Sequence, residues 1–132
     1  MNIGERNREI SRHYMNHIIG GQKGLITQAE YKQLRRNGEA NEGIEDTTDF
    51  KPVVKLFNAW GSQTWLISEI DEDGIFFGVC DLGQGQPELG YGHLPQIYHT
   101  LQRGLEKDRW FVASKTVSEY ANDARARGHI IA

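Results

Sequence analysis

The feature that most constrains how this chain can fold is a dense apolar stretch at residues 52–91. It contains most of the Phe and Trp residues, the single cysteine, Cys80, and a series of glycines spaced as in turns. Short runs of aromatic and β-branched residues separated by turn residues are typical of strands. This stretch must therefore supply most of the hydrophobic core, and the core must be built around a sheet.

Three strands are predicted in the stretch, at 52–57, 64–70 and 75–81, followed by a short return strand at 88–92. An Asp-Gly dipeptide at 73–74 favours a hairpin turn between the second and third strands. Each connection is short, so consecutive strands are expected to pair in antiparallel fashion.

The second and third predicted strands carry apolar residues on both faces. On the second strand, Trp65 and Ile67 oppose Leu66 and Ile70. Strands of this kind are usually covered on both sides. We therefore expect helices on one face of the sheet and a loop, the N-terminal helix or a second subunit on the other.

Helices are predicted before and after the strands. Their expected ranges are 4–19, 27–38, 93–104 and 116–128, with a fifth strand at 110–112. The second and fourth helices each begin with a capping box, TQAE and TVSE. Because short turn-linked strands do not alternate with helices here, the pattern indicates an α+β fold. It is expected to have an antiparallel sheet of four to five strands and helices packed mainly on one face.

The N-terminal helix is expected to be an appendage. Ile10, Tyr14 and Ile18 give it an apolar face at i, i+4 spacing. The glycine-rich segment 20–24 then forms a flexible joint. We expect residues 1–24 to be a helix and joint, and residues 25–132 to be a single α+β domain that folds without them.

Length and charge exclude several classes of protein. With 132 residues and one cysteine, the chain fits one domain without an internal disulfide. The N-terminus is charged where a signal peptide would be apolar, and the apolar runs are shorter than a membrane span, which predicts a cytoplasmic protein without a membrane segment. A net charge of −3 lacks the basic excess of nucleic-acid-binding proteins, so direct nucleic-acid binding is not expected.

The hairpin at 80–91 is the strongest candidate for a binding feature. Its glycines let a partner approach the backbone, and its polar side chains offer an adaptable edge. The aromatic side chain in the turn before the second strand is either a lid on the core or an exposed anchor for a partner. The residues predicted to bind are Trp60, Asp81, Gln84, Gln86, Glu88 and Tyr91.

An enzymatic alternative uses the same hairpin, with Cys80 as nucleophile and Glu69 or His93 as acid or base. Cys80, however, lies on an apolar strand without a positive charge nearby in sequence, so its thiol is expected to stay protonated. A structural interpretation of Glu69 is a cross-strand ion pair with Lys55.

No catalytic residue, cofactor or metal is predicted. The glycines of the hairpin do not form a dinucleotide fingerprint, because Pro87 and Glu88 stand where a helix should begin. His13 and His17 have i, i+4 spacing, but no further ligand stands at a spacing that would complete a metal site.

Several segments, in order, resemble one bacterial family. They are KPVVKLFNAWGSQTWLISEID, FGVCDLGQGQPELGY, residues 106–109 and SEYANDARARGHI. Over about residues 25–132 the chain resembles the family known as domain of unknown function 2958. The resemblance implies carriage on plasmids, integrative elements and phages, and therefore an accessory role for a mobile element. It supplies no catalytic residues.

We therefore expect an accessory protein of a mobile genetic element or phage that acts by protein–protein interaction. Inhibition of a host defence system and assistance to DNA transfer both stay open as its role. The expected partner is a protein complex encoded by the host or the element, and a homodimer is left open. The alternative is a small enzyme that uses the Cys80–Tyr91 hairpin with Glu69 or His93.

Overall fold

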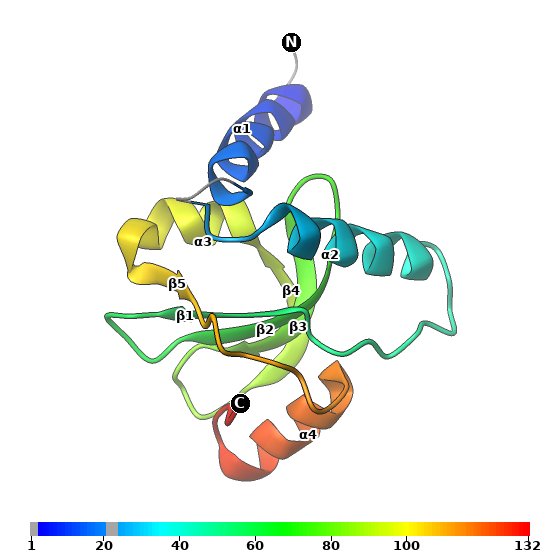
Figure 1. The fold of residues 1–132 in the computed structure, drawn as a ribbon, viewed down its shortest axis with the longest axis vertical. Coiled ribbons are helices and arrows are strands. Elements are labelled where there is room, and N and C mark those ends of the chain that lie inside the picture. The colour runs from blue at the N-terminus through cyan, green and yellow to red at the C-terminus, as the bar shows by residue number, and fades with distance from the viewer. Residues whose placement is uncertain (1–2, 21–23) are drawn as a thin grey trace.

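The strand β2 (Thr64–Ile70) lies at the centre of a five-stranded antiparallel sheet in a computed structural model that describes residues 3–20 and 24–132. The strand order is β4-β3-β2-β1-β5, so β4 and β5 form the two edges (Figure 1). The other strands are β1 (Val54–Asn58), β3 (Ile75–Asp81), β4 (Glu88–His93) and β5 (Leu105–Lys107). The α+β fold with an antiparallel sheet is confirmed.

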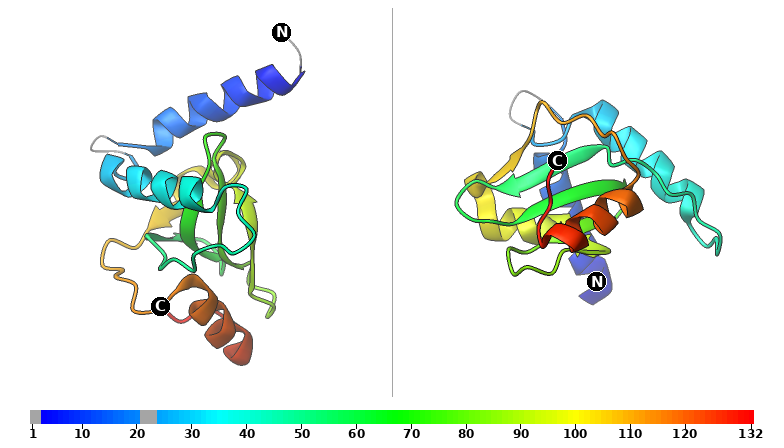
Figure 2. Two further views of the ribbon diagram at one scale, coloured as in Figure 1. Left: turned by 90° about the vertical axis from the view of Figure 1, so that its right-hand side faces the viewer. Right: turned by 90° about the horizontal axis from the view of Figure 1, so that it is seen from below.

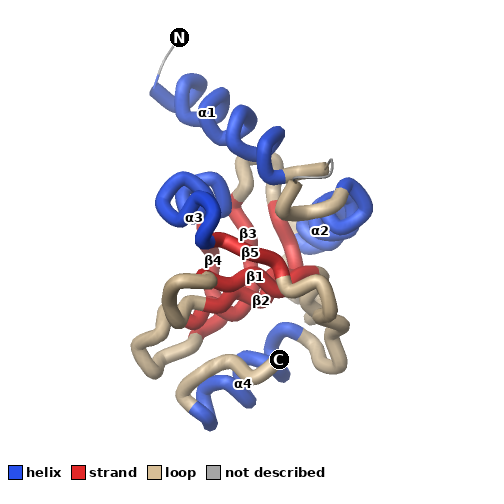
Figure 3. The backbone as a smooth tube through the Cα atoms, turned by 60° about the vertical axis from the view of Figure 1, so that its left-hand side comes forward, coloured by secondary structure: helices blue, strands red, loops and turns tan. Residues whose placement is uncertain are grey.

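Helices lie on both faces of the sheet. Within the described ranges they are α1 (Ile3–Ile18), α2 (Gln28–Asn41), α3 (Leu94–Leu101) with a 3-10 turn (Gln102–Gly104), and α4 (Val117–Arg127). Figure 3 shows α4 on the opposite side of the sheet from α1, α2 and α3. The predicted capping boxes are present at Thr27 and Thr116.

The larger core fills the face covered by α1, α2 and α3. Trp65 and Ile67 of β2 are buried there together with Phe76 of β3, against Leu34 of α2 and Leu94 of α3. Most of the helical packing is thus on this face, as the sequence pattern predicted.

The second face is covered by α4, where we expected a loop, the N-terminal helix or a second subunit. Leu66 and Val79 point to this side and pack against Tyr120, Ala121 and Ala124. The small alanines let the helix lie close to the strands, so a single short helix is enough to exclude water from them.

A β-bulge in β2 changes the predicted pattern of faces. The pairing of β2 with β3 shifts register between Ile67 and Glu69, so one residue is unpaired. Beyond the bulge Ile70 therefore joins Ile67 in the larger core. The prediction that Ile70 opposes Trp65 and Ile67, and that Glu69 lies with them, is wrong for this reason.

The second helix is longer than predicted. It was expected to end near Gly38 but continues to Asn41. A Cβ atom at Gly38 would lie 2.7 Å from the carbonyl oxygen of Ile70. The glycine therefore lets α2 approach the backbone of β2 and does not end the helix.

The fifth strand lies at Leu105–Lys107 and not at 110–112 as predicted. The side chain of Asp108 accepts a hydrogen bond from the backbone N–H of Trp110 at 2.9 Å, and its carbonyl accepts one from Phe111 at 3.3 Å. These bonds turn the chain away from the sheet directly after β5.

α1 contacts the rest of the protein through its C-terminal half. Met15 and Ile18 are buried in the larger core, and the hydroxyl of Tyr14 is hydrogen-bonded to Nδ1 of His99 at 2.6 Å. Ile10, predicted on the same apolar face, is 50% exposed. Figure 2 shows α1 projecting away from the sheet, so only its last turns contribute to the core.

Residues 25–132 remain our proposal for the part that folds on its own. We expect removal of residues 1–24 to leave a cooperative but lower thermal transition, because the apolar surface covered by Ile18 becomes exposed. In the full chain, Ile18→Ala should cost about 2–5 kcal/mol of unfolding free energy. Ile10→Ala is the matched control and should change little. A truncated product without a cooperative calorimetric transition would contradict the proposal.

Candidate functional site

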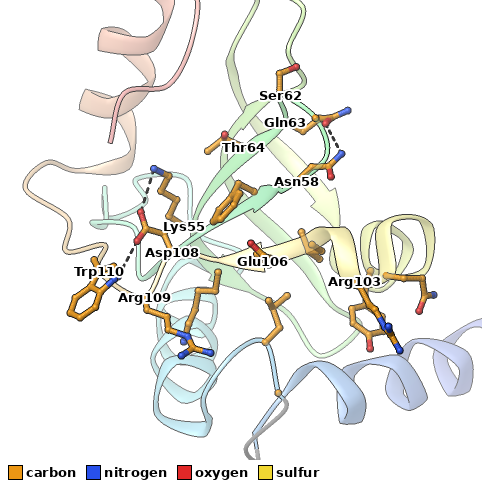
Figure 4. A pocket seen from close by; sticks show the side chains of 18 of the residues that line it. Lys55, Asn58, Ser62, Gln63, Thr64, Arg103, Glu106, Asp108, Arg109 and Trp110 are labelled. Atoms are coloured by element: carbon orange, nitrogen blue, oxygen red, sulfur yellow. Dashed lines mark hydrogen bonds and ion pairs between the residues drawn. The ribbon is translucent and has the colours of Figure 1, made fainter.

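A broad groove runs along β5 at one edge of the sheet. Its volume is 1390 Å³, and it is bounded by the segment around Leu25, by α3 and its 3-10 turn, by the β1–β2 turn and by the chain after β5. Figure 4 shows its side chains around β5, with Arg109 and Trp110 beyond one end of the strand and Arg103 beyond the other. The groove is therefore centred on an edge strand.

The outer side of β5 carries backbone groups without a strand partner. Asp108 donates its backbone N–H to the carbonyl of Lys55 at 3.0 Å, and Ala59 donates to Gly104 at 2.7 Å. Because bonded and non-bonded positions alternate along an antiparallel pair, Glu106 faces β1, whereas Leu105 and Lys107 direct their N–H and C=O groups away from it; the N–H of Leu105 is bonded to the carbonyl of Gln102. Among the described residues, β5 pairs with β1 alone.

Exposed aromatic side chains flank the groove at its two ends. Trp110 lines it and is 91% exposed. Trp60, in the β1–β2 turn, is 75% exposed, and its ring lies against Gly104, where a Cβ atom would be 2.7 Å from Cε3. Large exposed aromatic residues at a groove are typical anchors for a protein partner.

The charges in the groove are partly paired. Lys55 lies 3.5 Å from a carboxylate oxygen of Asp108, and Lys107 lies 2.8 Å from one of Glu30. Arg103 and Arg109 make no ion pair with any described residue. The unpaired charge of the groove is therefore mainly basic.

The tip of the 80–91 hairpin lies beside the β1–β2 turn. A Cβ atom at Gly83 would lie 2.0 Å from Oγ of Ser62, so the two loops are in direct contact. Gln84, Gln86 and Glu88 are exposed. The structure thus brings the hairpin tip and the turn that carries Trp60 to one end of the sheet.

Asp81 has a different environment from the other predicted binding residues. It is buried, and its two carboxylate oxygens accept backbone N–H bonds from Gly83 at 2.9 Å and Ile130 at 3.0 Å. Its carboxylate thereby joins the hairpin to the segment after α4. We infer that Asp81 positions the hairpin and does not itself contact a partner.

A second depression, of 440 Å³, lies between the end of α2, the β2–β3 turn and β4. It brings together Glu69 and Tyr91, and the Tyr91 ring packs on Phe77 with centroids 5.2 Å apart. Burial raises the pKa of the Glu69 carboxyl group, while a hydrogen bond from Nδ2 of Asn41 to Oε2, at 2.9 Å, acts in the opposite direction. The predicted Lys55–Glu69 pair is wrong, because Lys55 pairs with Asp108.

Glu69 can exchange a proton in this depression. No cysteine, serine, threonine, lysine or histidine is among the described residues that line it. Its possible nucleophiles are therefore carboxylates and the phenol of Tyr91.

The structure separates Cys80 from His93. Cys80 is opposite Glu88 and His93 is opposite Ile75, so the two lie about 17 Å apart along the strands. His93 is instead hydrogen-bonded through Nε2 to Oγ of Ser11 at 3.2 Å. A Cys80–His93 nucleophile pair is therefore excluded by geometry.

Neither a membrane-spanning helix nor a metal-binding cluster is present among the described residues. None of the helices in 3–20 and 24–132 has the length and apolar character needed to cross a membrane. In the same ranges, no three His, Cys, Asp or Glu side chains are grouped so as to hold a metal ion.

Comparison with known proteins places the chain in a family. The model of the family described as protein of unknown function (DUF2958) matches residues 25–131. The chain belongs to the DUF2958 family. No curated protein and no solved structure matches it. The match begins at Leu25, so α1 lies outside the matched residues.

Sequence reasoning missed the groove of this DUF2958 protein. Arg103, Lys107 and Trp110 were not predicted as binding residues, and 110–112 was interpreted as a strand. One signal was available: Asp108 stands two residues before Trp110, and an aspartate in that place favours a turn. A turn would have placed Trp110 at the surface.

The thiol of Cys80 gives a direct test of the site chemistry. Burial raises its pKa to about 11. Since the thiolate is the reactive form, we expect iodoacetamide to label the folded protein near neutral pH on the order of a hundredfold more slowly than an ordinary cysteine. Labelling should accelerate as the pH rises toward that pKa, and the denatured protein serves as the control. Rapid labelling of the folded protein near pH 7 would contradict this expectation.

Proposed function

We propose that this protein is a binding module that takes an extended segment of a partner protein along the free edge of β5. The observation that carries the proposal is the groove, because it follows an edge strand whose outer backbone groups have no strand partner. A segment that adds to an edge gains main-chain hydrogen bonds, and pockets beside the strand then give specificity.

The walls of the groove suit alternating side chains of such a segment. On one side of β5 lie Leu25 and Tyr98, which pack against the larger core, and on the other lie Phe57 and Thr64. Successive side chains of a bound strand would point alternately to these two walls. Each wall offers an apolar or aromatic contact, so either set of side chains could be held.

The ends of the groove favour a partner of particular composition. Trp110 and Trp60 offer aromatic anchors, and Arg103 and Arg109 offer unpaired positive charge. We therefore expect an extended segment with apolar residues and at least one acidic residue that meets an arginine. The positive charge of the two arginines also disfavours a basic segment in the groove.

The biological setting that we propose follows from the family resemblance. It is an accessory role for a mobile genetic element or phage in the cytoplasm, with a host-encoded or element-encoded protein complex as the partner. Inhibition of a defence system and assistance to DNA transfer both stay open within this proposal. The hairpin tip with Gln84, Gln86 and Glu88 would form a second contact with the same partner.

The enzymatic alternative is favoured by one observation, the raised pKa of Glu69 in the depression that it shares with Tyr91. A carboxyl group of this kind can serve as a general acid. Loss of biological activity in Glu69→Gln, with thermal stability and partner binding unchanged, would support this alternative over the binding module.

The groove is tested by affinity capture from a bacterial lysate, followed by binding measurements with the purified partner. Trp110→Ala should weaken binding about thirtyfold, equivalent to ~2 kcal/mol for a central aromatic anchor. Ile44→Ala, which removes a side chain that is 51% exposed elsewhere, is the matched control and should bind normally. Equal binding by the wild type and Trp110→Ala would overturn the role of the groove.

A second pair of variants tests strand addition itself. Lys107→Ala removes the ion pair with Glu30 but keeps the outward N–H group, whereas Lys107→Pro removes both. Only Lys107→Pro should abolish capture. In hydrogen exchange, the amide of Lys107 should become protected when the partner binds. If the two variants bind alike, the partner does not pair with the backbone.

The hairpin contact has its own test. The double variant Gln86→Ala and Glu88→Ala should weaken partner capture while thermal stability changes little, because both side chains are exposed. Cys80→Ala should keep full capture. Loss of activity in a folded Cys80→Ala protein would instead favour covalent chemistry at the hairpin.

A further inference from the structure

The opposite edge of the sheet is unprotected. β4 pairs with β3 in regular register through all of its residues, Glu88–His93, and nothing in the described residues pairs with its outer side. Soluble proteins usually block such an edge with lysine, proline or a bulge. The sequence of β4, ELGYGH, has neither lysine nor proline, and the pairing has no bulge.

The register shows which residues present their backbone on this edge. Leu94 donates its backbone N–H to the carbonyl of Gly74 at 2.9 Å, and the pairing of Ile75 with His93 makes those two residues direct opposites. Hydrogen-bonded positions alternate along an antiparallel pair. Leu89, Tyr91 and His93 therefore direct their N–H and C=O groups outward.

We propose that β4 pairs in antiparallel fashion with β4 of a second copy of this chain, with Tyr91 on the two-fold axis. Only positions with outward groups can be hydrogen-bonded to each other in such a pair. Tyr91 then faces the partner's Tyr91, and Leu89 faces the partner's His93. Leu89 and His93, the outward residues on either side of Tyr91, thereby both gain backbone partners. Each hydrogen-bonded pair exchanges two backbone hydrogen bonds.

The side chains on this edge agree with that register. Tyr91 is 77% exposed and packs on Phe77, so the pair would form a continuous aromatic row across the axis. On the other face Gly90 would oppose the partner's Gly92, where neither residue has a side chain. No atom lies within 4 Å of a Cβ position built at Gly90, so a second strand has room to approach.

Charge and apolar surface at the ends of β4 favour the same pairing. The strand has Glu88 at one end and His93 at the other, and antiparallel pairing brings each acidic end beside a histidine end. Ser11 of α1 is hydrogen-bonded to His93, and its neighbour Ile10 is 50% exposed, so additional apolar surface lies next to this edge. Since the outward groups of β4 are symmetric about Tyr91, a second copy satisfies all of them.

This inference concerns a different edge from the partner groove. In the pair the two sheets become one continuous sheet, and the two β5 strands form its outer edges. The grooves therefore stay open at both ends of the dimer, and failure of the pairing leaves the groove unaffected. Glu88 belongs both to the hairpin contact and to β4, so the variants that test the pairing leave it unchanged.

Sedimentation velocity of the full chain, from micromolar to millimolar protein, tests the proposal. We expect a reversible monomer–dimer equilibrium in the wild type. Tyr91→Lys places two like charges on the axis and should give a monomer at every concentration, with a thermal transition close to that of the wild type. Trp110→Lys, the matched aromatic-to-lysine change at the other edge, should still dimerise although it loses the partner.

Cross-linking tests the register directly. In a Cys80→Ala background, Tyr91→Cys should form an intermolecular disulfide under mild oxidation, because directly opposed positions lie within disulfide reach. Trp110→Cys should not. A wild-type protein that is monomeric at every concentration, or a Tyr91→Lys protein that dimerises as well as the wild type, would overturn the proposal. Dimers of Tyr91→Lys would place the interface on another surface.

Discussion

The middle of β2 is buried on both of its faces, and the rest of the structure depends on this constraint. Its neighbours Leu66 and Ile67 point to opposite sides and are both fully buried at 0% exposure. A strand of this kind must be covered by separate layers on its two sides. The helices before β5 provide one layer and α4 provides the other, which leaves only the sheet edges, β4 and β5, available for strand pairing with other chains.

The bulge in β2 is held by polar side chains of α2. Asn37 donates from Nδ2 to the carbonyl of Ser68 at 2.9 Å, and Arg35 donates to the carbonyl of Ile70 at 2.9 Å. A bulge disturbs the ladder and leaves backbone groups that need other partners. By supplying them, α2 makes the register shift stable, returns Ile70 to the core and directs Glu69 to the depression with Tyr91. One local irregularity thereby defines a second surface feature.

Local sequence signals predicted most elements, and long-range contacts account for the rest. The bounds of β2 and β3 and the two capping boxes follow from period, caps and turn residues. The sequence left open whether Trp60 covers the core or is exposed, and the structure shows it exposed. The extension of α2 past Gly38 depends on the close approach of β2 to Gly38. This is a long-range contact that local sequence does not indicate. The groove was missed because WFV has the composition of a strand, whereas the bonds made by Asp108 decide its conformation. The depression with Glu69 and Tyr91 depends on the bulge. The spacing of apolar residues in β2 did not indicate a bulge, so the depression was not predicted.

The placement of α4 has a consequence for the order in which the protein is made. Synthesis proceeds from the N-terminus, so all five strands and the helices of the larger core are synthesised before residues 117–127. During that interval Leu66 and Val79 have no cover, and the nascent sheet is open on one side. Until α4 docks, this side of the sheet exposes apolar surface to solvent and to other chains.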